Sequence, residues 1–204
     1  MIYNKNNFSI HNLEDKHSGN MVHNIIHVTK EFTEITNGHY AVRVYAPYGD
    51  YVDSKAEDLP NVGEGMGVKK DFESCVIAVN VAKEIEKAIP KMNTLPVLEN
   101  AWITEHTDKE HVEFCTTDLE ITRPIRARVE DIKYPDIDNV QPKGQPEFKI
   151  AFNAEYMLKI CQQFKRMDIK TVAIDFFGEN GVMKIFGKTT DMQKIEVLLM
   201  PMKR

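Results

Sequence analysis

Residues 147–177, EFKIAFNAEYMLKICQQFKRMDIKTVAIDFF, decide the predicted fold because one run contains a strand, a helix and a second strand. Segment 147–152 alternates polar and apolar side chains, which is typical of a strand, and Asn153 is a suitable helix N-cap. After Asn153, apolar side chains recur with the period of a helix. The face that we expect to be buried carries Ala154, Met157, Leu158, Cys161 and Phe164.

Strand-like runs at 170–177, 181–187 and 194–200 follow this helix, with the turn sequence GENG between the first two. The result is a repeat of one strand, one helix and three strands. An earlier part of the chain has the same order. It consists of a strand at 74–80, a helix at 81–89 that Pro90 ends, and strands within 97–106, 111–118 and 120–130.

The first part of the chain predicts three strands, within 21–29, 31–38 and 39–47, and no helix before them. Residues 11–20 are too few and too rich in turn residues for one. Residues 49–71 are acidic and contain several glycines, so we expect a long loop there. Helices next to antiparallel strands place the chain in the α+β class.

Composition limits the function classes. The 204 residues include 26 basic and 31 acidic side chains, so any contact with nucleic acid needs a local basic patch. No apolar run is long enough to span a bilayer, and the first residues lack the apolar core of a signal peptide. We therefore expect a cytoplasmic protein without a membrane partner. The three cysteines, Cys75, Cys115 and Cys161, lie beside apolar residues and predict reduced, buried thiols.

Motifs of catalysis are not found in the sequence. It contains no nucleotide-binding glycine loop, no nucleophile elbow and no HExxH motif. His23 and His27 are four apart, a metal-binding spacing on a helix, but they fall in a strand-like run. Asp118 and Glu120 are close in sequence, without an evident partner base. We expect no enzyme activity, no metal site and no cofactor.

Several segments together resemble the bacterial sliding clamp, the β subunit of DNA polymerase III. Along the chain these segments are ITNGHYAV (35–42), LPVLENAWIT (95–104), TTDLEI (116–121), KYPDIDNVQPK (133–143), FNAEYMLKICQQFKRMDIKTVAIDFF (152–177) and the final VLLMPMKR (197–204). The resemblance implies the DNA-clamp fold and a processivity factor that tethers partner proteins to DNA. A bacterial clamp has three domains of two repeats each, and it dimerises, whereas this chain offers about three repeats. The reduced size fits a phage or a mobile element.

Two domain organisations are compatible with three repeats. In the first, residues 1–72 are a partial clamp unit with the long loop 49–71, and residues 73–204 form a clamp-like domain of two repeats. In the second, the first two blocks form a middle domain and the last repeat is half of a final domain.

The resemblance also implies a pocket for short peptides of DNA polymerases and other partners, lined by the C-terminal strand. The matching positions are Thr36, Gly38, His39, Pro135, Val140, Leu198, Leu199, Met200, Pro201 and Met202. Tyr40, Ala41 and Asn139 depart from the usual residues of the family, so peptide preference is expected to differ. For Leu199 alone, burial within the sheet is the favoured interpretation.

Clamps bind double-stranded DNA through basic residues on helices that line a central hole, without reading the bases. The corresponding candidates are Lys83, Lys87, Lys91, Lys159, Lys165 and Arg166. The resemblance thus implies a homo-oligomer that clamp loaders place on DNA. The alternative is a clamp-derived adaptor or decoy that binds the same peptides without encircling DNA.

Overall fold

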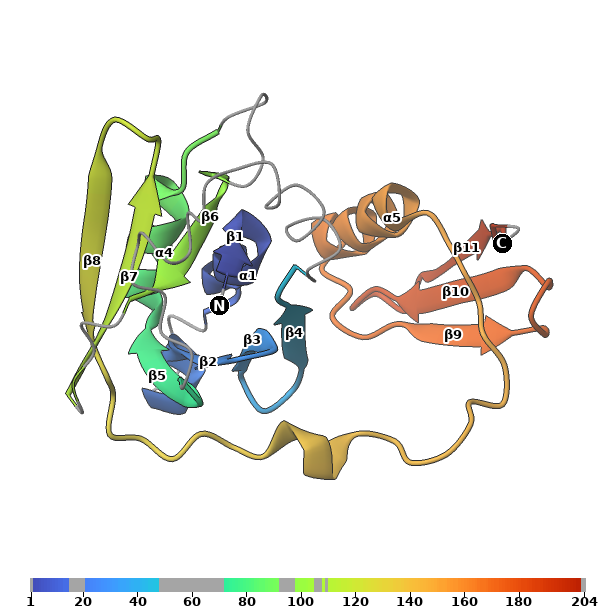
Figure 1. The fold of residues 1–204 in the computed structure, drawn as a ribbon. Helices are drawn as coiled ribbons and strands as arrows, with labels where there is room; N and C mark the ends of the chain where they lie inside the picture. Colours follow the sequence, from blue (N-terminus) through green and yellow to red (C-terminus); the bar gives the residue numbers. More distant parts are fainter. Residues whose placement is uncertain are drawn as a thin grey trace. The chain divides into compact units, whose positions relative to one another are not determined.

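The computed structural model describes residues 2–14, 21–47, 72–91, 98–104, 108 and 110–202, which divide into two compact units (Figure 1). The N-terminal unit comprises residues 1–140 and the C-terminal unit residues 141–204. The expected boundary at residue 72 is wrong, because strands from both sides of it share the sheets of the N-terminal unit. The second organisation, a middle domain followed by half of a final domain, stays a prediction. The expected loop 49–71 lies outside the described residues.

The N-terminal unit contains two four-stranded antiparallel sheets, ordered β4-β3-β2-β5 and β1-β6-β7-β8. Their strands are β1 (Ile2–Asn4), β2 (Ile25–Thr29), β3 (Phe32–Thr36), β4 (Ala41–Tyr45), β5 (Ser74–Ala78), β6 (Asn100–Ile103), β7 (His111–Thr117) and β8 (Thr122–Arg128). The predicted strands of both blocks are therefore present.

The two repeats of this unit exchange their first strands. β1 belongs to the first repeat but pairs with β6 of the second, through Tyr3 opposite Ala101. β5 belongs to the second repeat but pairs with β2 of the first, through Ile77 opposite Ile26. This exchange makes one domain out of two repeats, because neither sheet is complete without a strand from the other repeat.

A helix precedes the strands of the first repeat, so the prediction of none was wrong. The helix α1 (Lys5–Ser9) continues into a 3-10 helix at Ile10–Leu13. Asn4 is its N-cap, accepting from the Asn6 N–H, while the Asn7 side chain accepts from the Asn4 N–H in a capping box. Capping starts this helix although its polar sequence has no helical apolar period.

The core of the N-terminal unit forms where α1, the helix α4 (Val79–Ala88) and the inner faces of the sheets meet. Tyr3, Phe8 and Phe114 are fully buried and contact one another edge to face, with ring centroids 5.7–6.5 Å apart. These three rings come from β1, α1 and β7, so they connect both repeats. Cys75 and Cys115 are buried free thiols, as expected.

The C-terminal unit contains the helix α5 (Ala154–Arg166) and one three-stranded antiparallel sheet of order β11-β10-β9. Its strands are β9 (Ala173–Phe176), β10 (Met183–Lys188) and β11 (Lys194–Leu199). Asn153 caps α5 as predicted, its side chain accepting from the Tyr156 N–H. Phe164, Ile169, Met183, Ile185 and Leu199 form a small core.

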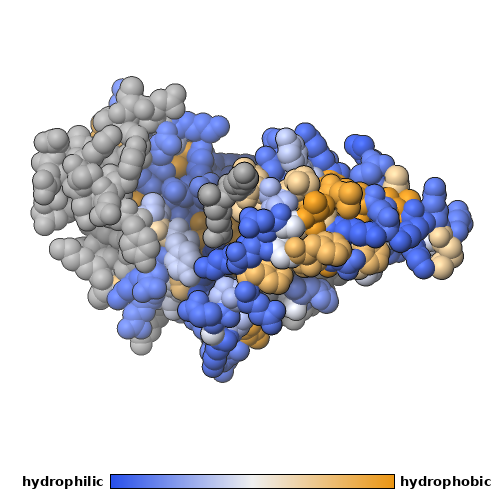
Figure 2. Space-filling view, turned by 90° about the vertical axis from the view of Figure 1, so that its right-hand side faces the viewer, coloured by the Kyte–Doolittle hydropathy of each residue, from blue (hydrophilic) through white to orange (hydrophobic). Residues whose placement is uncertain are grey.

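Two expectations fail in the C-terminal unit. Residues 147–152 form no strand, since none of the described residues pairs with them in a sheet. On α5, Met157 and Phe164 pack against the core together with Ile160, but Ala154, Leu158 and Cys161 are exposed. The helix therefore has a wider apolar face than its own sheet covers. Figure 2 shows apolar side chains gathered on part of the surface of the described residues.

Candidate peptide-binding and DNA-binding residues

The first group of candidate peptide-binding residues occupies the turn between β3 and β4. Thr36 is buried, and its hydroxyl donates to the Tyr40 carbonyl at 2.7 Å and accepts from the Gly38 N–H. Gly38 has a φ of +83°, which favours glycine. The Asn37 side chain accepts from the N–H groups of His39 and Tyr40. These bonds fix the turn, so that His39 and Tyr40 are presented on the surface.

The second group lies in segment 129–140, which is attached to the sheet of β2, β3 and β4. The guanidinium of Arg43 bonds Asp138 of this segment at 2.8 Å and the buried Glu34 of β3 at 2.8 Å. The ring of Tyr134 stacks on His27 with centroids 4.8 Å apart. Pro135 and Val140 are exposed on a segment held in place by these contacts, and Val140 is 76% exposed.

Burial lowers the pKa of the Arg43 guanidinium, but its hydrogen bonds to Asp138 and Glu34 outweigh this effect and raise that pKa overall. Arg43 also stacks over the Phe32 ring, with its guanidinium carbon 3.8 Å from the ring centroid. Arg43 was not among the predicted site residues, since its partners Glu34 and Asp138 lie on another strand and in another segment. The sequence feature that could have indicated it is a basic residue between two valines in a predicted strand.

The third group is the C-terminal strand and the residues after it. Leu198, Met200 and Met202 are 68%, 66% and 53% exposed, whereas Leu199 is buried in the core, the interpretation favoured for it. Pro201 is partly exposed, and the Met202 N–H donates to the Ala151 carbonyl at 2.8 Å. This bond holds the tail after β11, so its apolar side chains lie on a fixed backbone.

Charged residues surround Leu198 on the outer face of this sheet. Lys184 is opposite Leu198 in the β10–β11 register, and it pairs with Glu196 at 2.9 Å. Hydrogen bonds from Lys184 and Lys194 lower the pKa of Glu196 to about 2. The apolar side chains at the end of the strand therefore lie beside a surface ion pair.

The six candidate DNA-binding residues are exposed and lie on or just beyond two helices. Lys83 and Lys87 are one turn apart on α4, and Lys91 follows its end; Lys159, Lys165 and Arg166 are on α5. The newly found α1 adds Lys5, which the sequence analysis missed together with the helix. On α5 three basic residues stand against Glu155, whereas on α4 Lys83 and Lys87 are matched by Glu84 and Glu86, so the excess of positive charge that phosphate binding favours lies on α5 and at Lys91.

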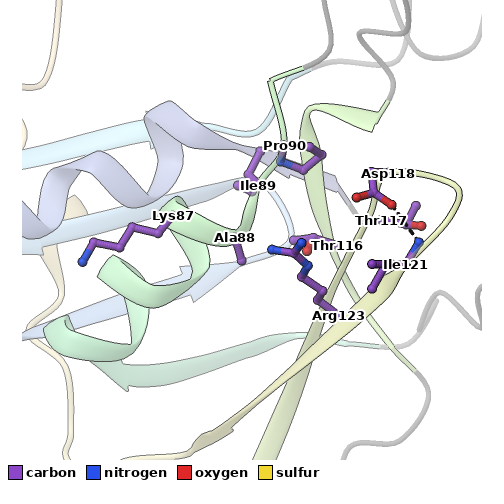
Figure 3. A pocket seen from close by; sticks show the side chains of 9 residues that line it. All are labelled: Lys87, Ala88, Ile89, Pro90, Thr116, Thr117, Asp118, Ile121 and Arg123. Atoms are coloured by element: carbon purple, nitrogen blue, oxygen red, sulfur yellow. Dashed lines mark hydrogen bonds between the residues drawn. The ribbon is translucent and has the colours of Figure 1, made fainter.

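A small pocket of about 190 Å³ lies between the end of α4 and the β7–β8 turn (Figure 3). In that view Arg123 extends toward Ala88 and Thr116, while Lys87 points away from the other lining side chains. Asp118 accepts from the Ile121 N–H at 2.7 Å, so the carboxylate stabilises the turn. The volume is below the roughly 300–1,000 Å³ of sites for organic ligands, and the lining residues include no nucleophile beside a base.

The described residues contain neither a cluster of metal-binding side chains nor a helix that could span a membrane. His27, considered with His23 as a metal pair, instead bonds Glu34 at 2.9 Å.

The solved structures that superpose on this chain share one fold. No protein-family model matches the sequence, and no curated protein is similar to it in sequence. Among solved structures, the β subunit of DNA polymerase of Streptococcus pyogenes superposes with a TM-score of 0.64 at 10% identity. The C. crescentus β sliding clamp has a TM-score of 0.63 at 11% identity, and the Pseudomonas aeruginosa DNA polymerase III subunit beta 0.60 at 14%.

These matches include nearly all of this chain, 98–100%, but only 50% of each of the three clamps. The chain therefore spans about half the length of the clamps it superposes on. The expected α+β clamp fold is confirmed. At 10–14% identity the similarity establishes the fold and leaves the activity to be argued from the residues.

Proposed function

We propose that this chain, which has the sliding-clamp fold, is a clamp-like processivity factor that tethers partner proteins to DNA. The observation that carries the proposal is the exposed apolar end of β11, formed by Leu198, Met200 and Met202. Exposed large apolar side chains on a fixed backbone indicate a binding surface. The resemblance to the clamp family implies a peptide pocket at this same end of the C-terminal strand.

The chemistry of this surface suits a short peptide with apolar anchors. Burial of one such side chain contributes about 1.5–3 kcal/mol, so two or three anchors give useful affinity. Methionine adapts to ligands of different shape, which fits a protein with several partners. The ordered turn at Gly38 and His39 and the exposed Pro135 and Val140 are further candidates for contacts with the same class of peptide.

Changing Met202 to aspartate should weaken the binding of a fluorescent clamp-binding peptide by at least about tenfold. A charge at this position would lose its hydration when an apolar anchor covers it. The backbone bond from Met202 to Ala151 stays available, so we expect the variant to fold. Fluorescence anisotropy measures the affinity, and circular dichroism checks the fold.

Met192→Asp is the matched control. Met192 is 67% exposed in the turn after β10, and it is not one of the candidate peptide-binding residues, so the same substitution is made away from the proposed surface. Its peptide affinity should equal that of the original chain. Equal affinity of the Met202→Asp variant would rule out the strand end as the binding surface. Loss of secondary structure in that variant would assign Met202 a structural role.

Reversal of charge at Lys87 and Lys159 together should lower affinity for double-stranded DNA by at least about tenfold at low salt. The dependence of affinity on salt should also become less steep, because fewer counterions are released. The measurement is a salt series of DNA binding. A double reversal at Lys133 and Lys188, exposed lysines outside the helices, serves as the control and should bind DNA with unchanged affinity. Equal loss in both double variants would indicate a general charge effect.

The adaptor remains the second candidate, because the exposed apolar end of β11 would serve it without any contact to DNA. An adaptor would bind the peptide and would not remain on circular DNA in the presence of a clamp loader. A processivity factor would remain on closed circles and leave them when the circle is linearised. This single comparison separates the two functions, because the peptide surface is common to both.

A further inference from the structure

The apolar surface of the chain is concentrated in the C-terminal unit. Eighteen large apolar side chains are exposed among the described residues, and thirteen of them lie within residues 141–204. Leu198, Met200 and Met202 belong to the candidate peptide surface. The others follow β9, α5 and the segment before α5, so a second apolar surface remains to be explained.

The strand β9 is the clearest part of this surface. Ile174 and Phe176 are opposite Ile185 and Met183 in the register, so all four side chains point to the core face of the sheet. Ile185 and Met183 are each 1% exposed, but Ile174 and Phe176 are 38% and 47% exposed. The core of the C-terminal unit is therefore open on the β9 side.

The N-terminal unit shows what covers this position in a complete domain. Its strands β2 and β6 follow a helix as β9 does, and their residues are buried or nearly so. The outer edge of β2 holds β5, and the outer edge of β6 holds β1. In each case the added strand directly precedes the helix of the other repeat. Within the described chain, no strand pairs with the corresponding edge of β9.

The segment that would be exchanged is present in the C-terminal unit, where it belongs to no sheet and its Ala151 carbonyl accepts from the Met202 N–H. Residues 147–152 directly precede α5 and alternate apolar and polar side chains, as a strand with one buried face does. They form no strand, and Phe148 and Phe152 remain 40% and 42% exposed. The sequence thus favours a strand for which this unit supplies no partner.

The helix α5 also has an apolar face that nothing in the C-terminal unit covers among the described residues. In the N-terminal unit α1 and α4 contact each other, and Val79, Ala82 and Ile85 of α4 are all buried. On α5 the exposed stripe is Ala154, Leu158 and Cys161, at the spacing of one helix face. Two of these three residues are small, which allows a second helix to approach closely.

We propose that a second copy of this chain completes the C-terminal unit by reciprocal strand exchange. Segment 147–152 of each copy adds to the β9 edge of the other, and the two α5 helices pack against each other. The contact is the same from both sides, as two-fold symmetry requires. The occupant is a second copy because the uncovered edge of β9 and the exposed face of α5 correspond to those that one repeat covers on the other in the N-terminal unit.

The two observed exchanges also predict the register. In both, the N-cap residue of the helix is opposite the first residue of the accepting strand: Asn4 opposite Asn100, and Ala78 opposite Ile25. The same rule places Asn153 opposite Ala173 of the other copy. Phe152 is then opposite Ile174, and Ile150 is opposite Phe176. Both pairs fall on the core face, so the exposed apolar side chains become buried together.

Crosslinking tests this register between two different variants, both in a Cys161→Ala background that removes the exposed thiol. One variant is Ala151→Cys and the other is Asp175→Cys, which the register places opposite each other on the outer face. Mild oxidation of the mixture should give a disulfide-linked dimer. A mixture of Ala151→Cys with Lys184→Cys is the control, because Lys184 lies on the inner strand β10 and should yield little dimer.

Molar mass in solution tests the association itself. The full chain should have a dimeric mass at micromolar concentration, and Phe176→Asp should shift it to the monomer, whereas Met192→Asp should keep the dimer. Because Phe176 is already 47% exposed, its substitution should leave the unit folded, which hydrogen exchange at α5 can verify. Two results together would overturn the proposal: a monomeric mass of the unaltered chain at 100 µM and equal crosslinking in both mixtures. That concentration is roughly a hundred times a micromolar dissociation constant, so a dimer of this affinity would be populated. Peptide affinity is measured separately, so failure here leaves the proposed function standing.

Discussion

Phe114→Ala is expected to destabilise the N-terminal unit by about 3–5 kcal/mol. The Phe114 side chain is fully buried and contacts both Tyr3 and Phe8 edge to face. Its removal leaves a cavity at the point where β1 and α1 of the first repeat meet β7 of the second. The loss therefore includes burial, packing and the contacts that join the two repeats.

Urea unfolding, monitored by tryptophan fluorescence, measures the stability of the N-terminal unit, which contains Phe114. The chain has one tryptophan, Trp102, which is 2% exposed on β6. Ile121→Ala is the control, since Ile121 is 54% exposed in the β7–β8 turn and should cost less than about 1 kcal/mol. A similar midpoint for both variants would contradict the assignment of the aromatic cluster as the centre of the core.

Arg43→Met is expected to cost a separate amount of about 3–5 kcal/mol, because it removes the guanidinium that pairs with the buried carboxylate of Glu34 and leaves that carboxylate a hydrogen bond to the His27 ring. The Glu34 side chain is 4% exposed and that of Arg43 14%. The substitution also removes the bond to Asp138, which attaches segment 129–140 to the sheet. We therefore expect faster hydrogen exchange in this segment as well as a lower urea midpoint.

Arg126→Met provides the matched control on an exposed strand. Arg126 pairs with Asp108 at 3.1 Å, and both side chains are more than half exposed. Such surface pairs contribute about 0–1 kcal/mol, so the control should unfold close to the original midpoint. Adding Glu34→Gln to the Arg43→Met variant should restore part of the loss, because it removes the unpaired charge. If the second substitution restores no stability, the loss in Arg43→Met comes mainly from the packing of Arg43 over the Phe32 ring.

The proposed function and the proposed dimer make separate demands on the C-terminal unit. The peptide surface uses Leu198, Met200 and Met202 at the end of β11, and strand exchange uses β9 at the other edge of the sheet. If the exchange occurs, two copies contain six repeats. By the family resemblance, six is the number in one chain of a bacterial clamp, and a ring of twelve repeats then needs four copies.

The sequence by itself determined the local elements. Helix α5 begins after Asn153 as predicted, and a strand overlaps each of the predicted runs from 170 onward. N-capping and periodicity act between residues a few positions apart, so a contiguous stretch contains the necessary information. The order of clamp-like segments likewise indicated the fold before any contact was known.

Only the tertiary structure decided which elements belong together. The helix α1 depends on capping by Asn4 and on burial of Phe8 beside Phe114, which is more than a hundred residues away in sequence. The pairing of β1 with β6, and the failure of residues 147–152 to form a strand, depend on whether a partner edge is available. A strand's hydrogen bonds are made to another strand, so its sequence gives the alternation of its faces but leaves the choice of partner to the fold.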